Sequence, residues 1–426
     1  MGGNRFGGMS SLYCIKVSRL KRFFIVIIFI VVSFRQGIAM AQEVKDGVGT
    51  AKLPDNSAYE GEFKNGVFNG QGMLTYANGD KFKGEFKDGL INGNGILTKI
   101  NGDKYQGQFK DGYPDGQGIL TDITGEKYEG EFNKGYLNGK GIFTGTRGAY
   151  VGELKNGLME GQGIFTGPDG SKYQGNFKDD EMNGKGILTY GNGSKYVGEF
   201  RNGLLDGNGA FTYADGSKYV GEFKDGTPNG RGINIDSQGG KYEGVFKKGA
   251  LNGNGTYSNP RGDRYEGEFK DNRMNGNGTL TNADGSKYIG EFKDGNPNGR
   301  GVETDVHGGK YEGEFNMGVL NGNGTYSDSR GDRYQGFFQK GQLIGQAKAL
   351  WASGEKYEGG VKDWMCDGKG VLINSQGDKY EGEFKNNTFN GQGTWTRSNG
   401  DKYVGEFKDG KPDGKGTWIR SNGESY

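Results

Sequence analysis

The residue types that most often perform chemistry are scarce in this chain. Its 426 residues include one histidine, His307, and two cysteines, Cys14 and Cys366. His307 precedes a glycine where similar segments carry Asn, Asp or Gln, so we interpret it as a turn residue. Cys366 stands where those segments carry Phe, Ile, Leu, Met or Pro, which favours packing over a reactive thiol. Because the one histidine is interpreted as a turn residue, no His-based triad is expected, and a histidine metal cluster is excluded.

The abundant carboxylates do not form a recognisable catalytic pair. Glu60 and Glu62 recur with Lys64 in nearly every segment, whereas glycoside hydrolysis needs two carboxylates in unequal environments. We interpret them as cross-strand ion pairs on a solvated face. The Asn-Gly-Asp turns lack the glycine-rich nonapeptide of calcium-binding β-rolls, and no GxG precedes a helix. The sequence predicts a non-enzyme with no catalytic residue, no metal and no cofactor.

All four tryptophans lie in the last quarter of the chain, at Trp351, Trp364, Trp395 and Trp418. Trp395 and Trp418 take a place that elsewhere mostly holds Leu, Phe or Tyr, which indicates packing, while Trp351 and Trp364 fall outside the pattern. Tryptophan is enriched at binding hot spots. We therefore predict that partners bind at residues 345–426, with these four side chains as candidate contacts.

The composition predicts which elements position these residues. Hydrophobic residues make up only 31% of the chain, yet aromatic residues reach 13%, with 24 Tyr and 26 Phe. Disordered chains are poor in aromatics. The 88 glycines follow no G-X-Y period, which excludes collagen. The chain is therefore expected to consist of strands and turns.

The first 41 residues are predicted to be an export signal. Residues 23–34 form an uncharged apolar run after Lys21 and Arg22, too short for a spanning helix but typical of a signal peptide. An Ala-Met-Ala pattern ends at Ala41, which predicts cleavage before Gln42. The alternative is an uncleaved signal anchor. Both interpretations place the rest of the chain across a membrane, in a periplasmic or extracellular location.

The mature chain would be slightly acidic and free of disulfides. The first 41 residues hold six of the 54 basic residues and no acidic one, which leaves 48 basic residues against 53 acidic ones. This sign disfavours nucleic acid and electrostatic attachment to anionic lipid. Cleavage would leave Cys366 as the one cysteine, so stability must come from elsewhere.

The chain repeats itself every 23 residues, except for one 22-residue repeat that begins at Tyr128. Residues 42–58 form a partial first repeat, and residues 59–426 form an array of sixteen. The repeats begin at Tyr59, Phe82, Tyr105, Tyr128, Tyr150, Tyr173, Tyr196, Tyr219, Tyr242, Tyr265, Tyr288, Tyr311, Tyr334, Tyr357, Tyr380 and Tyr403. A single repeat is too small to bury a core, so neighbours must stack.

Each repeat reads as one β-hairpin. In the first, YEGEFKNGVFNGQGMLTYANGDK, the opening residues alternate, with Tyr59 and Phe63 on one face. NGVFNG is predicted to be a loop, and a second strand is expected over 71–76. Asn78-Gly79 predicts the turn to the next hairpin. Four repeats place a Pro-Asx-Gly turn in the loop, at Pro114, Pro228, Pro297 and Pro412.

Glycines fill fixed places of the repeat. The third, twelfth and twenty-first places are always Gly, and the fourteenth is Gly except at Ala347. Glycine weakens a strand unless another group packs closely over it. We infer that the Tyr and Phe rings lie over the glycines of neighbouring strands, which gives a sheet its compactness without a second layer.

The motif YxGxxxxGxxxGxGxxxxxxGxx resembles the MORN (membrane occupation and recognition nexus) repeat over essentially the whole of 59–426. The resemblance implies an all-β fold, an elongated single-layer antiparallel sheet of tandem hairpins behind a hydrophobic signal or anchor helix. The repeats 334–356 and 357–379 depart most, through Ala347 and Trp364, and the sheet is expected to bend or open there.

The resemblance also implies scaffolding, dimerisation or membrane association. We predict a non-catalytic exported scaffold for protein partners, with homodimers formed through the unpaired edge strands. The alternative is a cell-envelope module that binds carbohydrate on exposed aromatic rows, or a lipid surface. No nucleic-acid partner is expected.

Overall fold

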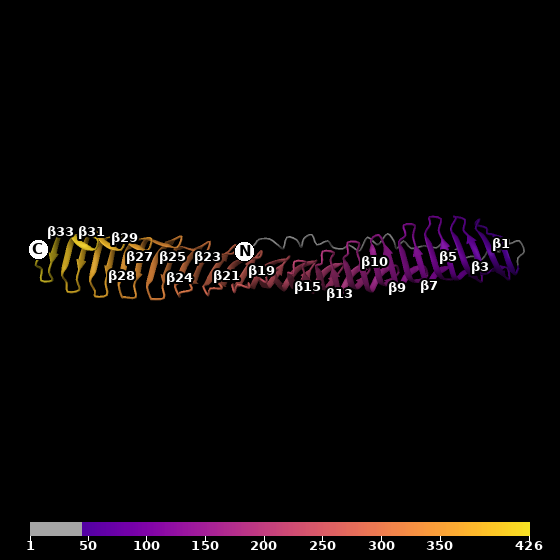
Figure 1. Ribbon diagram of the computed structural model, residues 1–426, viewed down its shortest axis with the longest axis horizontal. Helices are drawn as coiled ribbons and strands as arrows, with labels where there is room; N and C mark the ends of the chain where they lie inside the picture. The colour runs from indigo at the N-terminus through magenta and orange to yellow at the C-terminus, as the bar shows by residue number, and fades with distance from the viewer. Residues whose placement is uncertain (1–44) are drawn as a thin grey trace. The chain divides into compact units, whose positions relative to one another are not determined.

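A computed structural model describes residues 45–426, in which every regular element is a β-strand. The 33 strands belong to one open antiparallel sheet (Figure 1). This confirms the predicted all-β fold of tandem hairpins. The predicted signal segment, its cleavage between Ala41 and Gln42 and the first residues of the partial repeat lie outside the described residues. Within the described part, no helix is long and apolar enough to cross a membrane.

The chain divides into two compact units, which meet in sequence at Gly230 and Arg231. The strands of the first unit are β1 (Gly47–Lys52), β2 (Ala58–Lys64), β3 (Val67–Thr75), β4 (Lys81–Lys87), β5 (Leu90–Thr98), β6 (Lys104–Lys110), β7 (Tyr113–Thr121), β8 (Lys127–Asn133), β9 (Tyr136–Gly145), β10 (Gly148–Lys155), β11 (Leu158–Thr166), β12 (Lys172–Lys178), β13 (Glu181–Thr189), β14 (Lys195–Arg201), β15 (Leu204–Thr212) and β16 (Lys218–Lys224).

The boundary falls within β17 (Thr227–Ile235). The strands of the second unit are β18 (Lys241–Lys247), β19 (Ala250–Ser258), β20 (Arg264–Lys270), β21 (Arg273–Thr281), β22 (Lys287–Lys293), β23 (Asn296–Thr304), β24 (Lys310–Asn316), β25 (Val319–Ser327), β26 (Arg333–Gln339), β27 (Gln342–Leu350), β28 (Lys356–Lys362), β29 (Met365–Ile373), β30 (Lys379–Lys385), β31 (Thr388–Thr396), β32 (Lys402–Lys408) and β33 (Lys411–Ile419).

The opening strand of each repeat alternates as predicted. In β2, Tyr59, Gly61 and Phe63 are buried, and the residues between them are exposed. The same face continues across the sheet, because Tyr59 pairs with Leu74 of β3, which in turn pairs with Phe82 of β4. The buried face of the sheet is therefore built by the first, fifth, tenth and sixteenth places of successive repeats.

The predicted loop NGVFNG is wrong in its extent. Only Asn65 and Gly66 form the turn, and β3 already begins at Val67. The proline turns are wrong for the same reason, because Pro114 lies inside β7 and pairs with Phe109. A two-residue turn makes this a non-hydrogen-bonded pair of the hairpin, so the place needs no N–H toward its partner strand and tolerates proline.

Aromatic rings cover the glycines in most repeats, as inferred, although not in those that begin at Tyr242 and Tyr311. In the repeat that begins at Tyr173, the ring lies over Gly186 of the partner strand so closely that an added Cβ would stand 2.6 Å from Tyr173 Cε2. The Tyr173 hydroxyl donates a 2.8 Å hydrogen bond to the carbonyl of Asn176. The ring is 2% exposed. Glycine is needed at the fourteenth place because the ring occupies the volume of a side chain.

The rings also contact one another from repeat to repeat. Tyr105 meets Phe109 of its own strand edge-on at 5.0 Å between centroids, and Phe132 of the next repeat at 4.8 Å. Edge-to-face contacts of this kind are favourable beyond the area they bury. A chain poor in aliphatic residues therefore builds a core on one sheet face.

The ion pairs differ from those predicted. Lys127 and Glu129 pair at 2.7 Å along a single strand, and Lys379 and Glu381 do so at 2.6 Å. Lys348 and Glu358 do pair across two strands, at 3.1 Å. These side chains are about half exposed, so each pair contributes little to stability.

Carboxylates join consecutive turns. Asp80, in the turn before β4, accepts a 2.9 Å hydrogen bond from the amide of Ile100 in the next equivalent turn. Asp401 accepts a 2.9 Å hydrogen bond from the amide of Ser421 in the same way. This hydrogen bond holds the pKa of Asp401 below its usual value. The repeat is thus stabilised at its turns as well as on its buried face.

Candidate partner-binding surface

The repeat that begins at Tyr334 breaks the ring-over-glycine rule because its fourteenth place is Ala347. The alanine Cβ takes the space in which other repeats lodge the first-place ring, and Leu343 fills the gap beside Gly336. Tyr334 is half-buried, whereas most of its counterparts are buried. The sheet does not open here, since Ala347 pairs with Gly336 on one side and Gly359 on the other.

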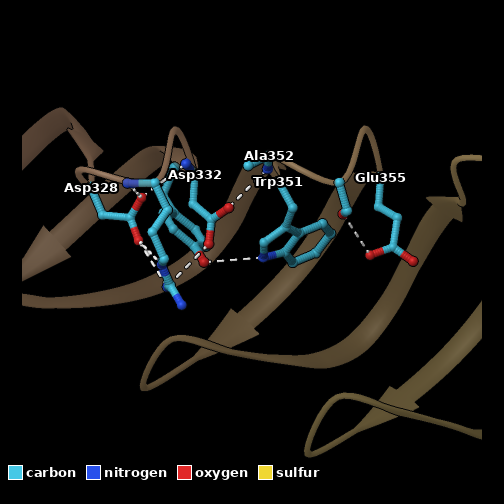
Figure 2. A network of polar contacts seen from close by, with 8 residues as sticks. Asp328, Asp332, Trp351, Ala352 and Glu355 are labelled. Carbon is cyan, nitrogen blue, oxygen red and sulfur yellow. Dashed lines mark hydrogen bonds and ion pairs between the residues drawn. The ribbon is translucent and has the colours of Figure 1, made fainter.

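The displaced Tyr334 meets the first of the four tryptophans. Trp351 Nε1 donates a 3.0 Å hydrogen bond to the Tyr334 hydroxyl, in the network that Figure 2 shows. In the same network, Asp332 accepts the amide of Ala352 at 2.8 Å. The guanidinium of Arg330 forms ion pairs with the carboxylates of Asp328, at 2.8 Å, and Asp332, at 3.3 Å.

Trp364 completes this cluster from the next repeat. It stands at the eighth place, usually glycine, and has a left-handed backbone with φ of 68°. Its ring packs edge-on against Tyr326 and Tyr334, at 5.5 Å each, and against Phe338 at 5.6 Å. A bulky residue at positive φ costs about 1–2 kcal/mol, so these ring contacts must offset local strain.

Trp395 and Trp418 form a second cluster. Their ring centroids lie 6.1 Å apart, and Trp418 also contacts Tyr403 at 5.2 Å. The guanidinium of Arg397 lies over both indoles, 4.9 Å from the centroid of Trp395 and 5.6 Å from that of Trp418. Both tryptophans are half-buried. The structure thus brings Trp395 and Trp418 into contact with each other, while Trp351 and Trp364 each contact Tyr334.

A third group of half-buried rings was missed from the sequence. Tyr242 lies against Tyr257 at 4.6 Å between centroids, and Tyr311 lies against Tyr326 at 4.3 Å. The feature of the sequence that could have revealed this group is a tyrosine at the sixteenth place, Tyr257 or Tyr326, whose ring contacts the ring at the first place. Burial raises the pKa of Tyr242 and Tyr311 to about 12.

The residues considered for chemistry are placed as packing and turn residues. His307 is exposed in a turn, and its amide donates to Asp305 at 2.8 Å. Cys366 is buried as a free thiol opposite Val361. Burial raises the pKa of Cys366 to about 11, the wrong direction for a nucleophile. Within 45–426, no cluster of three His, Cys, Asp or Glu side chains is placed to hold a metal ion.

Comparison with protein families decides what kind of array this is. The MORN repeat model matches residues 59–235, 242–333 and 380–425 as fourteen repeats. The chain belongs to the MORN repeat family. The model passes over 334–379, where Ala347 and Trp364 stand, although β26 to β29 continue the hairpins there. The array therefore has sixteen structural repeats, of which fourteen match the family pattern.

Other comparisons add little to this assignment. No curated protein matches the chain. A solved structure of the TCP domain of Drosophila melanogaster SAS-4 (dCPAP) with a proline-rich motif of Ana2 (dSTIL) is 16% identical. It covers 42% of this MORN chain and 90% of that one, with a TM-score of 0.24. The TCP10 domain of Danio rerio CPAP with a STIL peptide is 14% identical, covering 62% and 96%, with a TM-score of 0.20. At such scores neither likeness supports an argument.

Proposed function

We propose that this MORN protein is a non-catalytic scaffold, exported across a membrane, that binds protein partners through its C-terminal region, residues 345–426. The observation that carries the proposal is the half-buried cluster of Trp395, Trp418 and Arg397. Trp and Arg are the residue types most enriched at binding hot spots. Most rings at the first place of the repeats are buried, and the indoles of this cluster remain partly accessible.

The arrangement favours a protein over a carbohydrate ligand. A sugar ring stacks on the open face of an aromatic ring, but the guanidinium of Arg397 already lies over both indoles of this cluster. The tyrosine rows that could have offered long stacking platforms are buried, with Tyr380 1% and Tyr403 4% exposed. A partner side chain, by contrast, packs against the indole edges while Arg397 offers hydrogen bonds to a carboxylate or carbonyl.

The test is a crosslinked pull-down from intact cells with the full chain, two cluster variants and one control variant. Arg397→Ala removes the guanidinium above both indoles, and Trp395→Ala removes one of them. Arg420→Ala is the matched control, because Arg420 occupies the same place in the next turn but lies over Tyr426, 5.6 Å from its ring. Protein partners should be lost with both cluster variants and kept with the control.

Two other results would replace the proposal. Recovery of glycan alone, lost with Trp395→Ala, would assign the region to a carbohydrate-binding module. Partners that persist in both cluster variants would refute a C-terminal contact site. Export is tested separately by the mass of the protein recovered from cells, since cleavage leaves Gln42 first and an anchor leaves the segment attached.

A further inference from the structure

The exposed face of the sheet carries an apolar stripe in the first compact unit. We define the stripe as Ile142, Val151, Ile164, Ile187, Val197 and Val220, which lie at the second and fifteenth places of their repeats. Val151 pairs with Ile142 and Ile164, and Ile187 pairs with Val197. Gln174 and Ala210 complete the row between them, so that it crosses β9 to β16 without a charged residue.

These side chains point away from the core. Val151 is 48% exposed, Val197 45% and Val220 42%. They alternate along each strand with buried residues, as Val197 follows the fully buried Tyr196. Their exposure is therefore a property of the sheet face and not of a frayed segment.

The fold does not require this row to be apolar. At the start of the first unit the same row reads Glu60, Met73 and Lys83. In the second unit it includes Glu243, Thr256 and Glu266. Polar residues thus serve equally well at these places. A contiguous apolar surface on the solvent-exposed face of a sheet is typical of an interaction site.

Charged side chains line the two sides of the stripe, with only basic ones on one side and acidic ones in excess on the other. On one side lie Lys172, Lys195 and Lys218, each two residues before the stripe position of its strand and on the same face. On the other side lie Glu153, Glu199 and Glu222, each two residues after it. Lys140 and Lys185 pair with Glu153 and Glu199 on that side, which leaves it with three acidic and two basic side chains. We call these the lysine row and the glutamate row.

The surface is also hollowed beside the stripe. An open depression of about 520 Å³ is lined by Gln174, Ile187, Val197 and Glu199, among others. It lies between the centre of the stripe and the glutamate row. A long side chain from a facing surface can enter it.

We propose that the stripe is a self-association surface on which a second copy of this chain docks face to face. A two-fold axis parallel to the stripe superposes the two stripes and places the lysine row of each copy over the glutamate row of the other. A two-fold axis parallel to the strands would place lysine over lysine. Because one side carries three lysines and the other a net negative charge, the charge pattern favours the first arrangement, an isologous aligned sheet-on-sheet contact.

The size of the surface suits a stable dimer. Eight strands at about 4.8 Å each span about 34 Å between the first and the last, and the three rows cover about 20 Å along the strands. The contact would bury about 700 Å² on each copy and about 1,400 Å² in total, within the range of specific interfaces. It involves no residue of the tryptophan region and does not depend on the proposed scaffold function.

Analytical ultracentrifugation of the full chain tests the proposal. Wild type should shift from monomer to dimer at micromolar concentration. Val197→Lys, at the centre of the stripe, should weaken dimerisation at least tenfold. The matched control is Val404→Lys, 43% exposed at the same place of its repeat but flanked by Thr394 and Thr417. It should leave the dimer unchanged, and circular dichroism should show both variants folded.

Charge reversal tests the orientation. Replacing the three residues of the lysine row by Glu should weaken the dimer, and replacing the glutamate row by Lys should do the same. Mixing the two variants should restore association, because each negative row then faces a positive one. Dimers that neither reversal weakens would overturn the proposed arrangement.

The remaining outcomes also decide the proposal. A wild-type chain that stays monomeric up to about 100 μM would overturn it, as would equal weakening by Val404→Lys. If a monomeric wild type bound phosphatidylcholine vesicles and Val197→Lys abolished that binding, the stripe would be assigned to a lipid surface instead.

Discussion

Gly186 is the site at which the ring-over-glycine packing can be tested most directly. It lies in an ordinary strand, β13, and an added Cβ would stand 2.6 Å from Cε2 and from the hydroxyl oxygen of Tyr173. Gly186→Ala should therefore force the Tyr173 ring off the glycine, as Ala347 does to Tyr334. The backbone need not move, so the effect reports the ring alone.

The magnitude follows from what the ring loses. Its 2.8 Å hydrogen bond to Asn176 contributes about 0.5–1.5 kcal/mol. Exposing about 60 Å² of a ring that is now 2% exposed costs about 1.5 kcal/mol more. The lower entropy of the unfolded alanine chain offsets about 0.4–1 kcal/mol of this. We expect a net destabilisation of about 1–2.5 kcal/mol, local to β12 and β13.

The assay is hydrogen exchange of the amides in β12 and β13, because a long repeat array does not unfold in one step. Ala347→Gly is the control, because the Tyr334 ring at that site is already displaced. This change should lower the free energy of unfolding by less than about 1 kcal/mol. Equal changes at the two sites, or slower exchange in Gly186→Ala, would refute the account of why glycine is needed.

Three further outcomes are expected. Burial, and after it the charge of Glu383, raises the pKa of Tyr380 from 10 to about 12. The stability that the neutral Tyr380 contributes is therefore fully present below pH 10 and is lost between pH 10 and 12. Tyr380→Phe should therefore be less sensitive to alkali in far-UV circular dichroism, and an unchanged alkaline midpoint would contradict this. Asp332→Ala should cost about 1 kcal/mol and speed exchange of the Ala352 amide, with Asp332→Asn nearly neutral because its oxygen still accepts. Cys366 is 7% exposed with a pKa raised to about 11, so labelling by a thiol reagent at pH 8 should occur only on local unfolding, and fast labelling of the folded chain would refute its placement.

The strands were predictable because every repeat has the same alternation of apolar and polar residues and the same glycines. Alternation around Tyr59 placed one strand correctly, and the invariant glycines placed the rings. The loop was predicted too long because Asn69 and Gly70 look like a turn, although β3 includes them. A glycine with positive φ, such as Gly70 at 82°, can sit at a bulge inside a strand as well as in a turn, and sequence does not distinguish the two.

The sequence named the four tryptophans of the candidate surface but did not predict their contacts. Composition singled out Trp395 and Trp418, while their pairing beneath Arg397 depends on the register of β31 to β33 and on the path of the intervening turn. Trp364 was marked as an exception, yet its packing against Tyr334 depends on how Ala347 displaces that ring. The methyl group of Ala347 displaces the Tyr334 ring only because β26 and β27 are paired in the register that brings the two residues together.

The sequence by itself determined the repeat, the hairpin, the buried face and the family, because each depends on neighbours along the chain or on a pattern repeated sixteen times. Tertiary structure alone decided which rings remain accessible and which exposed residues form one surface. Ile142 and Val220 are far apart in sequence, and each looks like an isolated exposed residue. They belong to one stripe because antiparallel pairing brings the second and fifteenth places of successive repeats into a single row.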